Sequence, residues 1–251
     1  MKFISTTIEE LRGFYVEYFM EINGGFDDFF EDIIKEGKHY RIESESNVIG
    51  GFSITGDNKL SVIYLVPEKR NLYEKVFERL LVFQEVQGIV TITNDTMMMT
   101  QLMRRNFRIR KQACNFTYLM EDAETELVMK LATLEAVSVL EELFGDFLED
   151  YSEEIKLNKV YLGYDEGELV SLGLINEHDL VPNTVSIGMI VADSKRCRGF
   201  GTETIKGLIN IAKEKSLRVQ AGCWFYNHAS KKTLLKAGMT QSNMIIRVDE
   251  F

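Results

Sequence analysis

Apolar and polar residues alternate along the chain with a period that switches repeatedly between helix and strand. In the first half, a short apolar strand at residues 3–6 precedes helical spacing over residues 7–22 and 26–37. Three strands, a helix, a strand, a helix and a last strand or hairpin are then predicted at residues 39–44, 47–55, 59–66, 71–87, 88–93, 94–106 and 107–120.

The same order of elements begins again in the second half. A strand is predicted at residues 126–133 and one long helix at residues 134–155. The two strands of a hairpin, a strand, a helix, a strand, a helix and a final strand follow at residues 159–165, 168–177, 184–192, 199–216, 217–225, 227–238 and 244–251. The chain is therefore an internal repeat of element order with low identity between the copies.

This repeat divides the chain into two parts, each of the size of a small domain. The segments VIYLVPEKR and IGMIVADSKR, residues 62–70 and 187–196, correspond in kind. The charged stretch at residues 121–126 is the natural seam, so we place a boundary between residues 1–122 and 123–251. The mixed order predicts an α/β fold, in which helices pack on a mixed sheet.

Composition excludes several classes of protein. The chain has 251 residues, of which 45% are hydrophobic, and only two prolines, as in a well-packed globular protein. Its formal net charge of −10 disfavours non-specific nucleic-acid binding, which needs clustered basic residues. No apolar run approaches the roughly 20 residues of a membrane span, and the acidic N-terminus is unlike a signal peptide.

The cysteines indicate the redox environment. Cys114, Cys197 and Cys223 are few, odd in number and far apart, which favours a reducing compartment without a disulfide framework. We therefore expect a cytoplasmic protein without a membrane partner. The three histidines show no spacing typical of metal ligands, so no metal site is expected.

The sequence RCRGFG, residues 196–201, joins a predicted strand to a predicted helix. Backbone N–H groups at a helix start are unpaired and carry partial positive charge, and glycines let a ligand approach them closely. Lys195, Arg196 and Arg198 add positive charge. The pattern indicates an anion site, most readily for phosphate, although the glycines could also form only a tight turn. Walker A and dinucleotide-binding patterns are absent.

The loop resembles the pyrophosphate loop of the GNAT superfamily of N-acetyltransferases, written Arg/Gln-x-x-Gly-x-Gly/Ala. Arg196, Gly199 and Gly201 fill those places. Downstream, NHASKKTLLKAGM resembles the family's Asn-x-x-Ala/Ser box, with Asn227 and Ser230 in position. By element order the resemblance extends to the first half, so the chain resembles two GNAT domains in tandem. The segment GCWFYNHAS is similar, more narrowly, to acetyltransferases typified by zwittermicin A resistance proteins.

The resemblance implies acetyl-CoA as the cofactor of the second half. In the family, the strand before the loop splays from the next strand and its main chain binds the pantetheine arm. The cofactor-binding residues implied here are Met189, Val191, Arg196, Cys197, Arg198, Gly199, Phe200, Gly201, Thr202, Asn227 and Ser230. Asn227 is equally suited to cap the following helix.

The first half departs from this pattern. Its corresponding loop, PEKRNLYEKVFERL, contains no glycine, and Glu68 and Glu74 fall near the place where phosphates would lie. The distance from Val66 to Asn94 is 28 residues, against 36 from Val191 to Asn227. We expect residues 1–122 to bind no acetyl-CoA and to act as a structural partner and a wall of the acceptor cleft.

The resemblance also implies direct attack of an amine on the thioester, with the backbone N–H of Val191 as the oxyanion donor. The family's usual acid, a tyrosine seven residues after the asparagine, is Leu234 here. Tyr226 and Cys223 are the candidate acids in its place. The base is not identified: Ser186 and Gly188 stand where a glutamate is often found, and the nearby acids are Glu177, Asp179 and Asp193.

The leading hypothesis is an acetyl-CoA-dependent N-acetyltransferase acting on a primary amine of a small molecule. The acidic stretch at residues 141–154 would attract a cationic acceptor if it lined the cleft. A non-catalytic acyl-CoA-binding sensor or scaffold and a protein N-acetyltransferase are the alternatives. The sequence leaves open whether the protein is a monomer or a homodimer.

Overall fold

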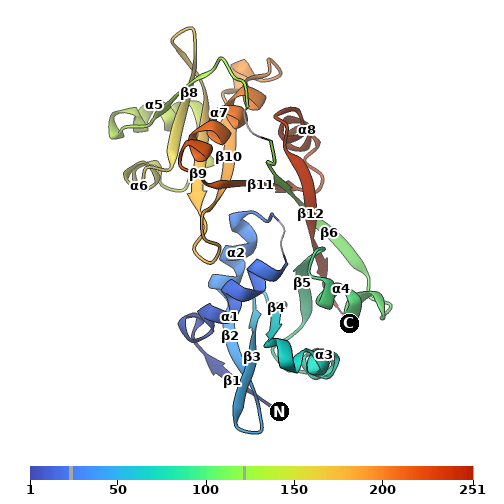
Figure 1. The fold of residues 1–251 in the computed structure, drawn as a ribbon. Coiled ribbons are helices and arrows are strands. Elements are labelled where there is room, and N and C mark those ends of the chain that lie inside the picture. Colours follow the sequence, from blue (N-terminus) through green and yellow to red (C-terminus); the bar gives the residue numbers. More distant parts are fainter. Residues whose placement is uncertain (23–24, 121–122, 251) are drawn as a thin grey trace.

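One continuous sheet runs through the computed structural model, which describes residues 1–22, 25–120 and 123–250 (Figure 1). The twelve strands of this described part lie in the order β1-β2-β3-β4-β5-β12-β6-β11-β10-β9-β8-β7. The predicted mixed α/β fold is confirmed, with both parallel and antiparallel pairs. Residues 121 and 122 of the predicted seam lie outside the described residues.

The N-terminal half follows the predicted order of elements. Its strands are β1 Lys2–Thr6, β2 Lys38–Ser44, β3 Asn47–Ile54, β4 Lys59–Leu65, β5 Gly88–Ile92 and β6 Ile109–Thr117. Its α-helices are α1 Ile8–Glu21, α2 Asp28–Lys35, α3 Tyr73–Leu81 and α4 Thr96–Met103. The segment predicted as a strand or hairpin at residues 107–120 contains a single strand, β6.

The C-terminal half repeats that order. Its strands are β7 Val128–Leu131, β8 Val160–Asp165, β9 Glu168–Glu177, β10 Thr184–Val191, β11 Arg218–Trp224 and β12 Thr240–Val248. Its α-helices are α5 Val137–Phe144, α6 Tyr151–Lys156, α7 Phe200–Glu214 and α8 His228–Lys236. The prediction of one helix over residues 134–155 is wrong, because Gly145 ends α5 with a φ of +58° and Asp150 caps a separate helix.

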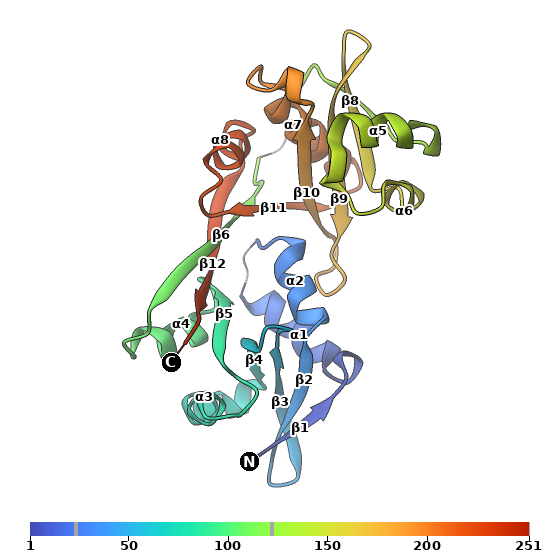
Figure 2. The same cartoon turned by 180° about the vertical axis from the view of Figure 1, so that it is seen from behind.

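The two halves exchange their last strands. β12, at the C-terminus, pairs with β5 of the first half, while β6, at the end of the first half, pairs with β11 of the second. The exchanged strands also pair with each other, from Thr240 opposite Thr117 to Val248 opposite Ile109. Figures 1 and 2 both show β6 and β12 running side by side as the ribbon that joins the halves. Each half therefore contains a strand of the other.

The cores follow the same exchange. Cys114 and Phe116 of β6 are fully buried among residues of β10, β11 and α7 in the second half. Ile246 and Val248 of β12 are buried in the core of the first half. Burial of side chains of this size contributes about 1.5–3 kcal/mol each to folding, so neither core is complete within its own segment of chain.

A fork in the sheet separates two strands of the second half. β10 and β11 run parallel and pair only at Thr184–Arg218, Val185–Val219 and Ser186–Gln220. Beyond these positions β10 continues against β9, and β11 continues against β6. The first half contains the same fork, because β4 and β5 pair only at Lys59–Gly88 and Leu60–Ile89. Among the described residues, no helix combines the length and apolar character that crossing a membrane requires.

The exchange predicts that residues 1–122 and 123–251, each expressed alone, fail to fold cooperatively. Each would expose the unpaired edge and the partly filled core that the missing strand covers. Co-expression should restore a one-to-one complex that co-purifies and melts in a single transition by circular dichroism. A monomeric, cooperatively melting 123–251 fragment would contradict the prediction.

Candidate functional site

A pocket of about 640 Å³ lies where β10, the start of α7 and α8 meet. It opens beside the fork, on the side of the sheet that α7 covers. Its lining residues are Met189, Ile190, Val191, Lys195, Arg196, Cys197, Gly199, Phe200, Gly201, Thr202, Asn227, Ala229, Ser230, Lys232, Thr233 and Lys236. None of the described residues that line it is acidic.

The glycine loop forms one wall of this pocket. Gly199 is the N-cap of α7 with a φ of +96°, a conformation that disfavours any residue with a side chain. A Cβ built on Gly199 would meet no atom within 4 Å, so its exposed backbone is open to a ligand. The first amide groups of α7 point out of the helix start, where they are available to an anion.

Basic side chains surround the loop. Arg196 is mostly exposed, lies 2.7 Å from Asp193 and donates from Nε to the carbonyl oxygen of Val191 at 3.4 Å. Lys195 is largely buried against Glu168. Lys232 and Lys236, one helical turn apart on α8, line the opposite wall. The wall charges favour a polyanionic ligand over a neutral one.

The main chain of β10 directs groups into the fork that no neighbouring strand pairs with, although the carbonyl oxygen of Val191 accepts from Arg196. Ala192 donates its N–H to Val170 on β9, so the residues at alternate positions, Val191 and Met189, direct their N–H and C=O groups away from β9. On that side β11 has already diverged. The N–H of Val191 therefore points into the gap between the strands, where a reacting carbonyl oxygen can be bound.

The structure brings ten of the eleven predicted cofactor residues to this pocket. Arg198 is the exception and does not line the pocket. Its guanidinium lies over the ring of Phe200, 5.1 Å from the ring centroid. The sequence analysis did not select Lys232 or Lys236. These two lysines are four residues apart in the helix that follows Asn227, which places them on one helix face. Asn227 does cap α8, accepting from the N–H of Ser230 at 3.0 Å.

Neither candidate acid lines the pocket. Tyr226 is 69% exposed and packs edge-on against Phe225. Cys223 is half-buried at the end of β11, where burial raises the pKa of its thiol to about 11, with a smaller contribution from Cys114. The Cys223 thiol therefore stays protonated at neutral pH. Leu234, at the family's tyrosine position, is buried in the core.

Two of the three carboxylates considered as bases, Asp179 and Asp193, are already engaged in ion pairs. Asp179 forms an ion pair with Arg12 of the first half at 2.7 Å, which lowers its pKa. Asp193 pairs with Arg196. Ser186 is buried and its hydroxyl lies 2.9 Å from Nε2 of His178, while it accepts from the N–H of Asp28 at 2.7 Å.

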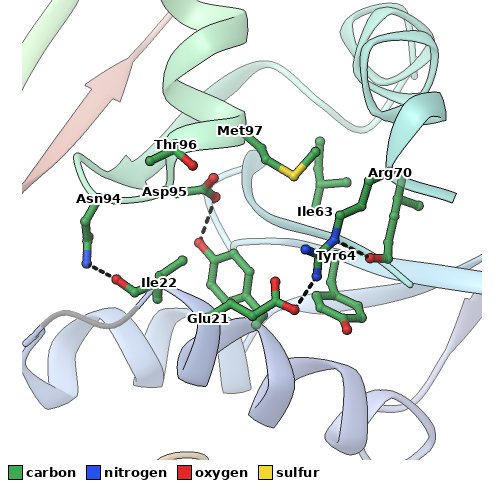
Figure 3. Close-up of a pocket in the computed structure, with 11 residues that line it drawn as sticks. Glu21, Ile22, Ile63, Tyr64, Arg70, Asn94, Asp95, Thr96 and Met97 are labelled. Atoms are coloured by element: carbon green, nitrogen blue, oxygen red, sulfur yellow. Dashed lines mark hydrogen bonds and ion pairs between the residues drawn. The ribbon is translucent and has the colours of Figure 1, made fainter. Parts of the chain in front are cut away.

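The first half contains a counterpart of this pocket, shown in Figure 3. Arg70 donates to the carbonyl oxygen of Leu65 at 3.5 Å, as Arg196 does to Val191. Asp95 caps α4 as Asn227 caps α8. Matched in this way, the segment from Leu65 to Asp95 is six residues shorter than its counterpart, a smaller difference than the sequence comparison from Val66 indicated.

Carboxylates occupy this counterpart pocket. Glu21 of α1 forms an ion pair with Arg70, and buried Asp95 accepts from the hydroxyl of Tyr18 at 2.9 Å (Figure 3). Glu74, expected near the phosphates, instead pairs with Arg104 at 3.0 Å, and Glu68 lines a separate hollow. The acid that meets the arginine thus comes from α1, far away in sequence.

The comparisons with known proteins agree with this repeat. Residues 7–119 match a family model described as an acetyltransferase (GNAT) domain, and residues 118–239 match the acetyltransferase (GNAT) family model. No curated protein matches the chain.

Solved structures share the fold. An acetyltransferase from the GNAT family of Colwellia psychrerythraea is 18% identical, with a TM-score of 0.89 over 100% of both chains. A tandem GNAT protein from the clavulanic acid biosynthesis pathway is 10% identical, with a TM-score of 0.58 over 98% of this chain and 97% of that one. A GNAT-type enzyme from Sphaerobacter thermophilus is 12% identical, with a TM-score of 0.52 over 83% and 79%.

The two caps should differ in their contribution to stability. Asp95→Ala removes a cap and a tyrosine partner in a buried site, and we expect a loss of about 2–4 kcal/mol. Asn227→Ala removes an exposed cap, with an expected loss of about 0.5–1 kcal/mol. Urea unfolding of both variants measures the difference, and equal losses would contradict it.

Proposed function

The chain belongs to the GNAT acetyltransferase family with two such domains in tandem, and from this premise we propose that its second half, residues 123–251, binds acetyl-CoA and acetylates a primary amine of a small molecule. The observation that carries the proposal is the pocket beside the β10–β11 fork. It combines a strand with unpaired main-chain groups, a left-handed glycine at a helix start and a basic wall.

These features suit the parts of acetyl-CoA separately. The amide groups at the start of α7, with Arg196 and the α8 lysines, would hold the pyrophosphate. The main-chain groups of Met189 and Val191 would hold the pantetheine arm along the fork. When bound, acetyl-CoA supplies an activated acyl group, and the N–H of Val191 would stabilise negative charge on its carbonyl oxygen.

The two candidate proton donors for the departing thiolate differ in burial. Cys223 lies at the end of β11 and stays protonated at neutral pH, whereas Tyr226 is directed to solvent. Both remain candidates, and solvent can also protonate a thiolate that leaves readily. Because neither candidate acid lines the pocket, a scaffold that binds acyl-CoA without turnover is a second candidate function.

The first half would bind no acetyl-CoA. Its counterpart pocket places Glu21 on the arginine that a phosphate would need, and like charges repel there. The acidic residues of α5 and α6 would attract a cationic acceptor if these helices line its cleft. The zwittermicin A resistance subfamily, a peptide acceptor, the cytoplasmic location and the oligomeric state stay predictions.

Calorimetric titration with acetyl-CoA tests the proposal. The protein should bind one equivalent, and Gly199→Glu should abolish binding, because the side chain is strained at that φ and its carboxylate repels phosphate. A thiol-release assay over small amines and peptides then identifies the acceptor class.

Gly167→Glu is the matched control. Gly167 has a φ of +84° and open surroundings, like Gly199, but lies in the β8–β9 turn and does not line the pocket. It should bind acetyl-CoA like the unmodified protein. No binding by the unmodified protein refutes the proposal, and binding without thiol release for any amine favours the scaffold.

A further inference from the structure

A carboxyl group of the first half lies directly against β11 of the second half. Asp27 is the N-cap residue of α2, yet its side chain makes no capping hydrogen bond. It extends instead to Gly222, where a Cβ built on the glycine would fall 1.6 Å from Oδ2 of Asp27. Only glycine at position 222 lets the carboxyl group approach the strand this closely.

This contact is at the fork. Gly222 comes two residues after Gln220, the last residue of β11 that pairs with β10. Both views of the fold show α2 extending from the first half toward the second (Figures 1 and 2). Counted from the pair Ser186–Gln220, Gly222 is level with Gly188, so Asp27 lies beside the opening between the strands, three residues along β10 from Val191.

Asp27 approaches the fork from the face opposite α7. Val185, Ile187 and Ala221 of the two strands are buried in the core beneath α7. The alternate residue Ser186 bonds to α2, so Gly188 faces α2 as well. A Cβ built on Gly188 would meet no atom within 4 Å, so there is open space beside β10 on this face. An acceptor entering here would reach the fork from the side opposite the cofactor pocket.

The polar atoms around Asp27 are incompletely paired. Oδ1 of Asp27 is buried and has no hydrogen-bond partner among the described residues. The same holds for Oδ1 of Asn176 on β9 and Oε1 of Gln220 on β11. Buried polar atoms are seldom left without partners, so the unpaired Oδ1 of Asp27 indicates a place where a hydrogen-bond donor would be favourable. A protonated or neutral amine is such a donor.

We propose that Asp27 is the general base of the transferase, supplied by the catalytically silent half to the active half. This inference rests on the acetyltransferase function proposed above. Asp27 accepts the proton that the amine nitrogen loses as its bond to the acetyl carbon forms. The bond from that carbon to sulfur breaks, the thiolate takes a proton from Cys223 or solvent, and the products are an N-acetyl amine and the free thiol.

His178, the other titratable group nearby, is less suited to this role. Its side chain is fully buried, and its two nitrogens face Ser186 at 2.9 Å and Glu31 at 3.8 Å. Burial lowers its pKa to about 4, so it is neutral at pH 7 and enclosed on both sides. Asp27 retains partial exposure.

The charges around Asp27 set its titration. Burial, with smaller contributions from the neighbouring carboxylates of Asp28 and Asp32, raises its pKa to about 7, while nearby backbone N–H groups at the start of α2 act in the opposite direction. Cys223, the next residue along β11 after Gly222, packs against the core on the opposite face of the strand and is a neutral thiol. A base with this pKa accepts a proton only above about pH 7, and transfer from an amine should weaken below that pH.

Asp27→Asn tests the assignment, with Asp32→Asn on the same helix as the matched control. Among the described residues, the Asp32 carboxylate forms its ion pair with Lys35 of the same helix. Asp27→Asn should bind acetyl-CoA with unchanged affinity but lose about 10²–10⁴-fold in kcat, together with the fall in rate below pH 7. Asp32→Asn should retain the rate, and the fall in rate at low pH should persist with only a small shift to lower pH, because the Asp32 carboxylate contributes weakly to the raised pKa of Asp27.

Two further measurements do not depend on turnover. Carbon NMR of the ligand-free protein should show one aspartate carboxyl titrating near pH 7 that is missing in Asp27→Asn. Because the folded protein holds this proton more tightly than the unfolded chain, ionised Asp27 lowers stability as pH rises from about 4 to about 7. Asp27→Asn should therefore have a higher Tm than the unmodified protein at pH 8 and an equal one near pH 4.

Gly222→Ala perturbs the position of the carboxyl group while keeping it. The added methyl group must displace Asp27, so kcat should fall while acetyl-CoA affinity is retained, and the loss should not add to that of Asp27→Asn. If the protein binds acetyl-CoA and turns over but Asp27→Asn keeps its rate and pH profile, the assignment is overturned. Absent acetyl-CoA binding would instead refute the proposed function itself.

Discussion

The structure depends on the exchange of β6 and β12 between the halves. A two-copy chain could close each sheet with its own last strand, which would leave two domains joined by a linker. Here each last strand pairs across, so one hydrogen-bonded ladder runs through both copies. Rigid alignment of the halves follows from main-chain pairing over the length of two strands, and it does not require a large side-chain interface.

That alignment lets two copies of one scaffold diverge in function. Both contain the fork, the arginine that returns to the end of its strand, and a capped helix after the next strand. In the second copy the loop ends at Gly199, the N-cap of α7, and the residue that caps α8, Asn227, is exposed. In the first copy Glu21 forms an ion pair with the arginine, and Tyr18 donates a hydrogen bond to the buried cap residue Asp95, so the same geometry carries carboxylates in its pocket. Charge and burial, rather than fold, separate the two.

Local patterns in the sequence were enough to predict the elements, the repeat and the loop. Gly199 is suited to a helix N-cap with a positive φ, because few other residues tolerate that conformation. Its spacing from Arg196 then identifies the loop. The break at Gly145 was missed because the apolar spacing on both sides is helical. Strand exchange could not be predicted, because β6 and β12 have the same alternation whether they pair within their own half or across.

The proposed base, Asp27, could not be predicted from the sequence for the same reason. The sequence pattern directs attention to β10, where Ser186 and Gly188 occupy the positions of the usual base, on the assumption that each domain supplies its own catalytic groups. Asp27 is about 160 residues away along the chain from Ser186 and looks like an ordinary helix cap, the residue type most often found there. Only the exchange brings α2 over β11 with an accuracy that proton transfer needs. Under the proposal that Asp27 is the base, the first copy supplies a functional group to the second, and the carboxylates and aromatic side chains of its own pocket are compatible with that role.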